Sequence, residues 1–92
     1  MKLSLIQEKA VPILRRAGVR RASLFGSVTR GKSLPNDIDI LVELSQQASL
    51  LNFINLKNRL EEGLGQKVDL VEYGSIKPAL KTSIMAAAVD LM

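Results

Sequence analysis

The sequence has 92 residues, 47% of them hydrophobic, which predicts one globular domain over residues 1–92 rather than a multidomain or disordered chain. It contains no cysteine and no histidine, so a disulfide framework, a thiolate zinc site and Ser-His or Cys-His catalysis are excluded. The net charge of +4 suits an anionic ligand, or equally a solvated basic surface.

The first expected element is a helix that begins near Ser4 and ends before Gly18. Ser4 and Gln7 form a capping-box pattern, and apolar residues then follow helical spacing as far as Ala17. Gly18 offers a helix stop. Pro12 lies inside this segment and removes one backbone hydrogen bond, so we expect a kink or a later helix start there.

Two strands are expected next, on either side of a glycine turn and a basic loop. Val19 to Phe25 is apolar and runs into Gly26, which can end a strand and open a turn. The segment 37–44 alternates strictly. Its apolar face carries Ile38, Ile40, Val42 and Leu44, and its opposite face carries Asp37, Asp39, Leu41 and Glu43.

The second half of the sequence is expected to form a helix, a strand and a last helix. Helical spacing extends from Ser49 to Leu64 through Leu50, Phe53, Ile54 and Leu60. Lys67 to Glu72 is expected as a strand, and a helix from Lys77 or Lys81 to Met92 has Pro78 in its first turn. The resulting order predicts an α/β (α+β) fold, a small mixed β-sheet flanked by helices.

Asp37 and Asp39 are the first candidate functional residues. Two positions apart on a strand, both side chains leave the same face with roots about 6.6 Å apart. An isolated pair of this kind is most often a solvated face of an edge strand. Here Asp69 interrupts a later apolar strand, and carboxylates are the ligands that Mg²⁺ prefers. The pair also follows a Gly-Ser turn and a basic loop, and together these features favour a metal site at Asp37 and Asp39.

The turn before the first aspartate has the residues of a phosphate site. Gly26 lets a phosphate approach the backbone, Ser27 offers its hydroxyl and amide, and Arg30 adds a charged fork. A Gly-Ser pair alone is usually only a turn, and a nearby arginine is usually solvated. Their place between the two strands favours phosphate binding.

The run Leu24-Phe25-Gly26-Ser27-Val28-Thr29-Arg30-Gly31, followed by Asp37-Ile38-Asp39-Ile40-Leu41-Val42-Glu43, resembles the signature of the DNA polymerase β-like nucleotidyltransferase superfamily. More narrowly, it resembles the minimal nucleotidyltransferase family. Gly26 and Ser27 match the phosphate-binding pair, Arg30 matches the arginine after it, and the aspartates at 37, 39 and 69 match the three metal-binding carboxylates. Thr29 and Asn36 depart mildly from the pattern, which affects positioning rather than ligation.

The resemblance implies a nucleotidyltransferase fold and transfer of a nucleoside monophosphate from an NTP to a hydroxyl group. ATP is the expected donor, and two Mg²⁺ ions are the expected cofactors, held by Asp37, Asp39 and Asp69. The charge on the departing pyrophosphate would be stabilised by Gly26, Ser27 and Arg30. It also implies a HEPN-domain toxin as partner and acceptor, with this chain as the antitoxin of a type VII-like pair. The motif fixes neither the NTP nor the acceptor hydroxyl.

Several alternatives stay open at this point. One is an antitoxin that neutralises its partner by binding alone. Nucleic acid is a less favoured ligand, because the chain has only three aromatic residues for base stacking. Tyr73 is expected as a strand-end aromatic more than a stacking residue. The apolar stripe between Ile84 and Met92 could pack on the sheet or dock a partner. With no signal peptide or long apolar segment, we expect a cytoplasmic protein away from membranes. An oligomer is possible.

Overall fold

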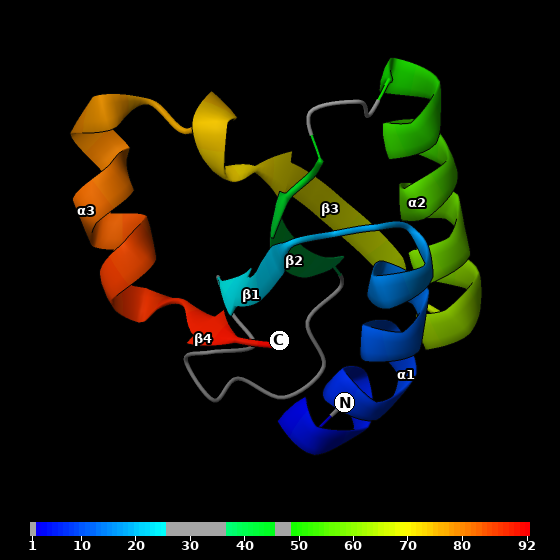
Figure 1. The fold of residues 1–92 in the computed structure, drawn as a ribbon. Helices are drawn as coiled ribbons and strands as arrows, with labels where there is room; N and C mark the ends of the chain where they lie inside the picture. The colour runs from blue at the N-terminus through cyan, green and yellow to red at the C-terminus, as the bar shows by residue number, and fades with distance from the viewer. Residues whose placement is uncertain (1, 26–36, 46–48) are drawn as a thin grey trace.

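The computed structural model describes residues 2–25, 37–45 and 49–92. The elements in chain order are α1 (Leu3–Arg16), β1 (Arg21–Phe25), β2 (Asp37–Glu43), α2 (Leu50–Leu64), β3 (Lys67–Glu72), the short 3-10 helix η2 (Tyr73–Ser75), α3 (Pro78–Ala87) and β4 (Val89–Asp90). The described strands form one sheet in the order β3-β2-β1-β4 (Figure 1). β2 and β3 run parallel, and β1 is antiparallel to β2 and β4. The expected mixed sheet flanked by helices is confirmed.

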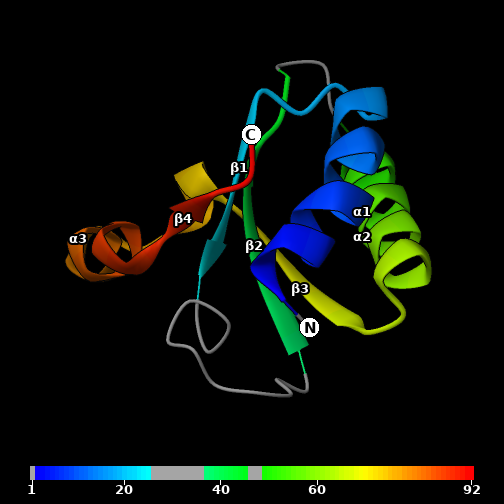
Figure 2. The ribbon, with the colours of Figure 1, turned by 90° about the horizontal axis from the view of Figure 1, so that it is seen from below.

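The helices lie on both sides of this sheet. Figure 2 shows α1 and α2 together on one face and α3 on the other side, beyond β1 and β4. The main core fills the space between the sheet and the α1–α2 layer. Its buried residues include Ile6, Ala10 and Leu14 of α1, Leu56, Leu60 and Leu64 of α2, and Ala22, Leu24, Ile38, Ile40, Val42, Val68 and Leu70 of the sheet. In the part of the chain that is described, no helix has the length and apolar character needed to cross a membrane.

The first helix ends where the sequence predicts but begins differently. Gly18 has φ +76°, its N–H donates to Arg15 O at 3.1 Å, and the Val19 N–H donates to Leu14 O at 3.1 Å. These two bonds form a Schellman motif, which satisfies the last carbonyls of the helix. The predicted capping box is wrong, because the helix starts at Leu3 and places Ser4 inside it. The predicted later start at Pro12 is also wrong, since α1 runs through that residue.

The second helix is capped at both ends, and its apolar face is shifted from the expected one. Ser49 Oγ accepts a hydrogen bond from the Asn52 N–H at 3.2 Å, and Gly65 ends the helix at φ +68°. Of the apolar stripe expected from the sequence, Leu50 and Ile54 are 75% and 44% exposed. Leu56 is buried instead, because the face that meets α1 passes through positions 56, 60 and 64.

The C-terminal region differs most from the sequence prediction. Pro78 opens α3 as expected, but the helix ends at Ala87 instead of Met92. Ala88 is extended, and the next two residues form β4, which pairs with β1. The Leu91 N–H donates to Ala22 O at 2.8 Å, and the Leu91 side chain is buried in the main core. Pairing with the edge of β1 that β2 leaves open outweighs the helical pattern. The apolar stripe predicted between Ile84 and Met92 is therefore divided between α3 and the sheet.

A buried polar network lies on the sheet face turned away from α1 and α2. Ser23 Oγ of β1 lies 2.5 Å from the Tyr73 hydroxyl and donates to Asp90 Oδ1 of β4 at 3.1 Å. The Arg21 guanidinium carbon lies 4.3 Å from the centre of the Tyr73 ring, a cation–π contact. Tyr73 is 8% exposed, which favours the structural role expected for it over base stacking.

Candidate active site

The first two candidate carboxylates lie on the sheet face away from α1 and α2. Ile38 and Ile40 are fully buried in the core below the sheet. Because side chains alternate along a strand, Asp39 leaves β2 on the opposite face, and it is half-buried there. Asp37 is the first residue of β2, but its side chain lies outside the described part of the chain.

The third candidate, Asp69, lies beside Asp39. The parallel register of β2 and β3 pairs these two residues directly. Val68 and Leu70 are buried in the core, so the exposed Asp69 side chain leaves the same face as Asp39. Neighbouring strands are about 4.8 Å apart, which brings two carboxylates together from segments that are 30 positions apart in the sequence.

The last turn of α2 positions the beginning of β3. The Val68 N–H donates to Glu61 Oε2 at 3.0 Å. This bond connects the residue before Asp69 to the helix that also packs on the core. The Asp69 backbone is therefore fixed both by sheet pairing and by the α2–β3 turn.

The paired carboxylates have the donor chemistry for magnesium. Two oxygen-donor side chains on one face repel each other, and a hard divalent cation offsets that repulsion. The described side chains contain no group of three acidic, histidine or cysteine ligands, and the third expected ligand, Asp37, belongs to the part not described. Asp39 and Asp69 thus fit two of the three predicted metal-ligand positions.

The predicted phosphate-binding residues Gly26, Ser27 and Arg30 lie outside the described residues. The described residues on each side of that segment can be located. Phe25, at the end of β1, is in register with Asp39, and Asp37 begins β2. The segment that carries the expected phosphate site thus leaves and re-enters the sheet at the end that holds the carboxylates.

The structure adds one residue that was not singled out in the sequence. Lys67 begins β3 and is in register with Asp37. It is exposed, and it precedes Asp69 by two positions on the same strand. Strand alternation could have placed it on the face of Asp69, but only the β2–β3 register shows that it is opposite Asp37.

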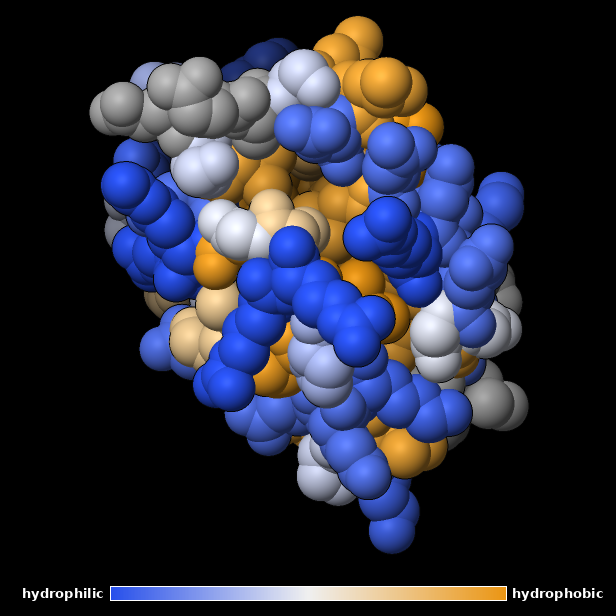
Figure 3. Space-filling model, turned by 45° about the vertical axis from the view of Figure 1, so that its right-hand side comes forward, coloured by the Kyte–Doolittle hydropathy of each residue, from blue (hydrophilic) through white to orange (hydrophobic). Residues whose placement is uncertain are grey.

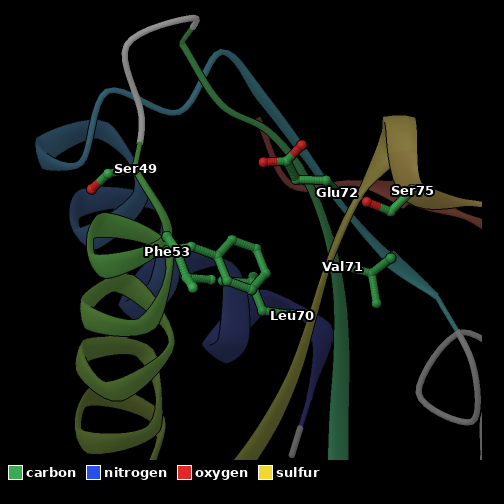
Figure 4. Close-up of a pocket in the computed structure, with 7 residues that line it drawn as sticks. Ser49, Phe53, Leu70, Val71, Glu72 and Ser75 are labelled. Carbon is green, nitrogen blue, oxygen red and sulfur yellow. The ribbon is translucent and has the colours of Figure 1, made fainter.

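A hollow of ≈ 350 Å³ lies near the other end of β3 and is distinct from the carboxylate pair (Figure 4). It lies between the beginning of α2 and the end of β3, and Phe53 points across it towards Leu70. Seen from the side of α1 and α2, the surface is mostly hydrophilic, with apolar surface showing between the polar side chains and at the upper edge (Figure 3). None of the candidate carboxylates lines the hollow, so we do not assign it to the site.

Comparison with known protein families identifies the fold and the chemistry. The family described as "Polymerase beta, Nucleotidyltransferase" matches residues 8–92. The chain belongs to this nucleotidyltransferase family. The match includes both strands that carry the aspartates and the segment between β1 and β2. The enzyme class expected from the motif is therefore confirmed.

Two archaeal relatives of this nucleotidyltransferase are named for protein adenylylation. A Methanocaldococcus jannaschii protein, described as a candidate protein adenylyltransferase, is 47% identical over the full length of both chains. The protein adenylyltransferase MntA of Thermococcus cleftensis is 41% identical over 80% of this chain and 76% of its own.

Solved structures show the same architecture. A candidate minimal nucleotidyltransferase superposes with a TM-score of 0.83 at 32% identity, covering 97% of this chain and 95% of that one. A toxin–antitoxin complex with AMP-PNP gives a TM-score of 0.79 at 27% identity over 94% and 72% of the two chains. An MNT antitoxin in complex with a tri-AMPylated Shewanella oneidensis HEPN toxin gives 0.75 at 25% identity over 97% and 71%. The likeness to minimal nucleotidyltransferases is therefore confirmed in sequence and in fold.

Proposed function

We propose that this nucleotidyltransferase transfers AMP from ATP to a hydroxyl group of a HEPN-type toxin and thereby acts as its antitoxin. The observation that carries the proposal is the direct pairing of Asp39 with Asp69 on the sheet face away from α1 and α2, at the end where Asp37 begins β2. The names of the two archaeal relatives support AMP as the transferred group. The complexes with AMP-PNP and with an AMPylated HEPN toxin support the donor and the partner.

In the proposed reaction, the acceptor oxygen forms a bond to the α-phosphorus of ATP. The bond from that phosphorus to the bridging oxygen breaks, pyrophosphate leaves with the electron pair, and the hydroxyl proton passes to water. Gly26, Ser27 and Arg30 are assigned to the β- and γ-phosphates, whose negative charge increases as pyrophosphate departs. The rigid sheet fixes the Asp39 and Asp69 backbones before substrate binds, so little reorganisation is required.

Asp37, Asp39 and Asp69 are assigned as the magnesium ligands. When bound, magnesium supplies Lewis-acid stabilisation of phosphate charge and favours ionisation of the acceptor hydroxyl. The fit rests on the described pair, Asp39 and Asp69, which are in register on adjacent strands and leave the same face of the sheet. The carboxylates themselves orient the nucleotide and hold the reacting groups on one face of the sheet.

The test is incubation of the purified protein with ATP and magnesium, with and without the HEPN-type partner, followed by intact-mass measurement. We expect the partner to gain the mass of one or more AMP groups. Replacing Asp37 and Asp39 together by asparagine is expected to lower the transfer rate by at least about 100-fold, and chelation of magnesium to stop it. Glu62→Gln is the control, because Glu62 is an exposed carboxylate on α2, the helix that packs on the opposite face.

Two outcomes would contradict the proposal. Transfer that persists in the double asparagine variant would remove the assigned site. Partner neutralisation that persists in that variant, with no mass gain in either form, would favour an antitoxin that acts by binding alone. A thermal melt of each variant establishes that the substitution leaves the fold intact.

A further inference from the structure

Lys67 lies beside the carboxylate pair. This placement follows from strand pairing and not from its neighbours in the sequence. It is the first residue of β3, in register with the backbone of Asp37 and two positions before Asp69. Val68 is buried in the core, so the exposed Lys67 side chain leaves the opposite face. That is the face from which Asp39 and Asp69 project.

The lysine side chain is long enough to reach the space above these carboxylates. β3 is an edge strand, with β2 as its neighbour on one side in the described sheet. The strand spacing of about 4.8 Å is shorter than the extended lysine side chain, so the ammonium can turn over the face towards β2.

Two structural roles are available to an exposed lysine here. It can discourage pairing of the edge strand with another chain, and it can form a cross-strand ion pair that contributes little to stability. Neither predicts an effect on a ligand bound between Asp39 and Asp69.

We propose that Lys67 is a substrate-binding residue whose Nζ donates to a phosphate oxygen of the bound nucleotide. The proposal rests on the function proposed above, since it requires a nucleotide at the Asp39–Asp69 pair. A nucleoside triphosphate adds more negative charge to three aspartates than two divalent ions neutralise, and lysine binds phosphate as a compact point charge. Lys67 supplies that charge from β3, whereas the segment assigned to the β- and γ-phosphates follows β1.

The experiment measures binding of AMP-PNP with magnesium to the full chain by titration calorimetry, without a partner. Lys67→Gln is expected to weaken binding by about 10- to 100-fold, the range for loss of a charged hydrogen bond. Lys67→Arg keeps the charge and is expected to retain most of the affinity. Lys9→Gln makes the same charge change on an exposed residue of α1, which covers the other sheet face, and is expected to bind as the unsubstituted chain does.

The inference is overturned if Lys67→Gln binds within about twofold of the unsubstituted chain, or if Lys9→Gln loses as much affinity. A thermal melt accompanies each titration, and the Lys67→Arg variant gives the decisive comparison if Lys67→Gln is unstable. Mass measurement of the partner separates this inference from the proposed function. If Lys67→Gln binds AMP-PNP as the unsubstituted chain does and transfer to the partner is normal, only the role proposed for Lys67 is contradicted. Lys67-dependent binding without transfer to any acceptor contradicts the proposed function alone.

Discussion

Replacing Tyr73 by phenylalanine tests the polar network that joins β4 to β1. The change removes the hydroxyl that lies 2.5 Å from Ser23 Oγ, and it keeps the ring beneath the Arg21 guanidinium. Ser23 is only 1% exposed, so water does not replace the lost partner, although the bond to Asp90 remains. A hydrogen bond of this kind contributes about 0.5–1.5 kcal/mol. We therefore expect the free energy of unfolding to fall by about 1 kcal/mol.

Urea denaturation followed by circular dichroism measures this loss. For a domain of this size, a change of about 1 kcal/mol corresponds to a decrease in Tm of about 4–8 °C. Ser23→Ala, alone and combined with Tyr73→Phe, completes a double-mutant cycle that isolates the energy of the pair. A coupling energy within about 0.3 kcal/mol of zero would refute the reasoning, because it would mean that the two hydroxyls do not stabilise each other.

Three further substitutions test the helix ends and the core. Gly18→Ala should cost about 1–2 kcal/mol because the residue has φ +76°, while Gly74→Ala, with open space around it and no positive φ, should cost much less; equal losses in urea denaturation would contradict the Schellman assignment. Leu60→Ala should destabilise by about 2–5 kcal/mol, since the side chain is fully buried, whereas Leu51→Ala at 66% exposure should stay within about 0.5 kcal/mol in the same assay. Ser49→Ala should lower Tm through loss of about 1 kcal/mol of capping energy, and an unchanged melting curve would argue against the bond to the Asn52 N–H.

The sequence predicted the elements whose local pattern and tertiary environment agree. β2 alternates as expected, with Ile38 and Ile40 in the core, and β3 has the predicted bounds Lys67–Glu72. Gly18 ends the first helix because a left-handed residue is required there. In these segments, the apolar side chains that repeat along the sequence are the ones that lie in the core.

The structure differs from the sequence prediction where contacts between residues far apart in the chain determine the secondary structure or the burial. Val89 and Asp90 carry a helical pattern, yet they pair with Ser23 and Leu24, which are 65 or more positions earlier in the chain. Leu41 was expected on the carboxylate face and lies there, but it is fully buried, unlike the exposed Asp69. Local patterns do not contain these contacts, because they depend on which strands become neighbours.

The candidate site could be predicted only in part, because it also depends on which strands become neighbours. Alternation placed Asp39 and Asp69 on outward faces of their strands, but it could not show that they are directly paired. That pairing depends on the parallel alignment of β2 and β3 across the α2 connection. The residues at 26, 27 and 30 belong to a part of the chain that the structure does not describe, so their assignment remains a prediction.

The alternation of β3 also links stability to chemistry. A slip of one position in β3 would turn Asp69 into the core and expose Val68 and Leu70. Such a misalignment would bury a charge and lose apolar burial at the same time, so it is strongly disfavoured. The enzyme therefore needs no separate device to keep its acidic residues aligned: sequence changes that preserve the core of this strand also preserve the direction of its carboxylate.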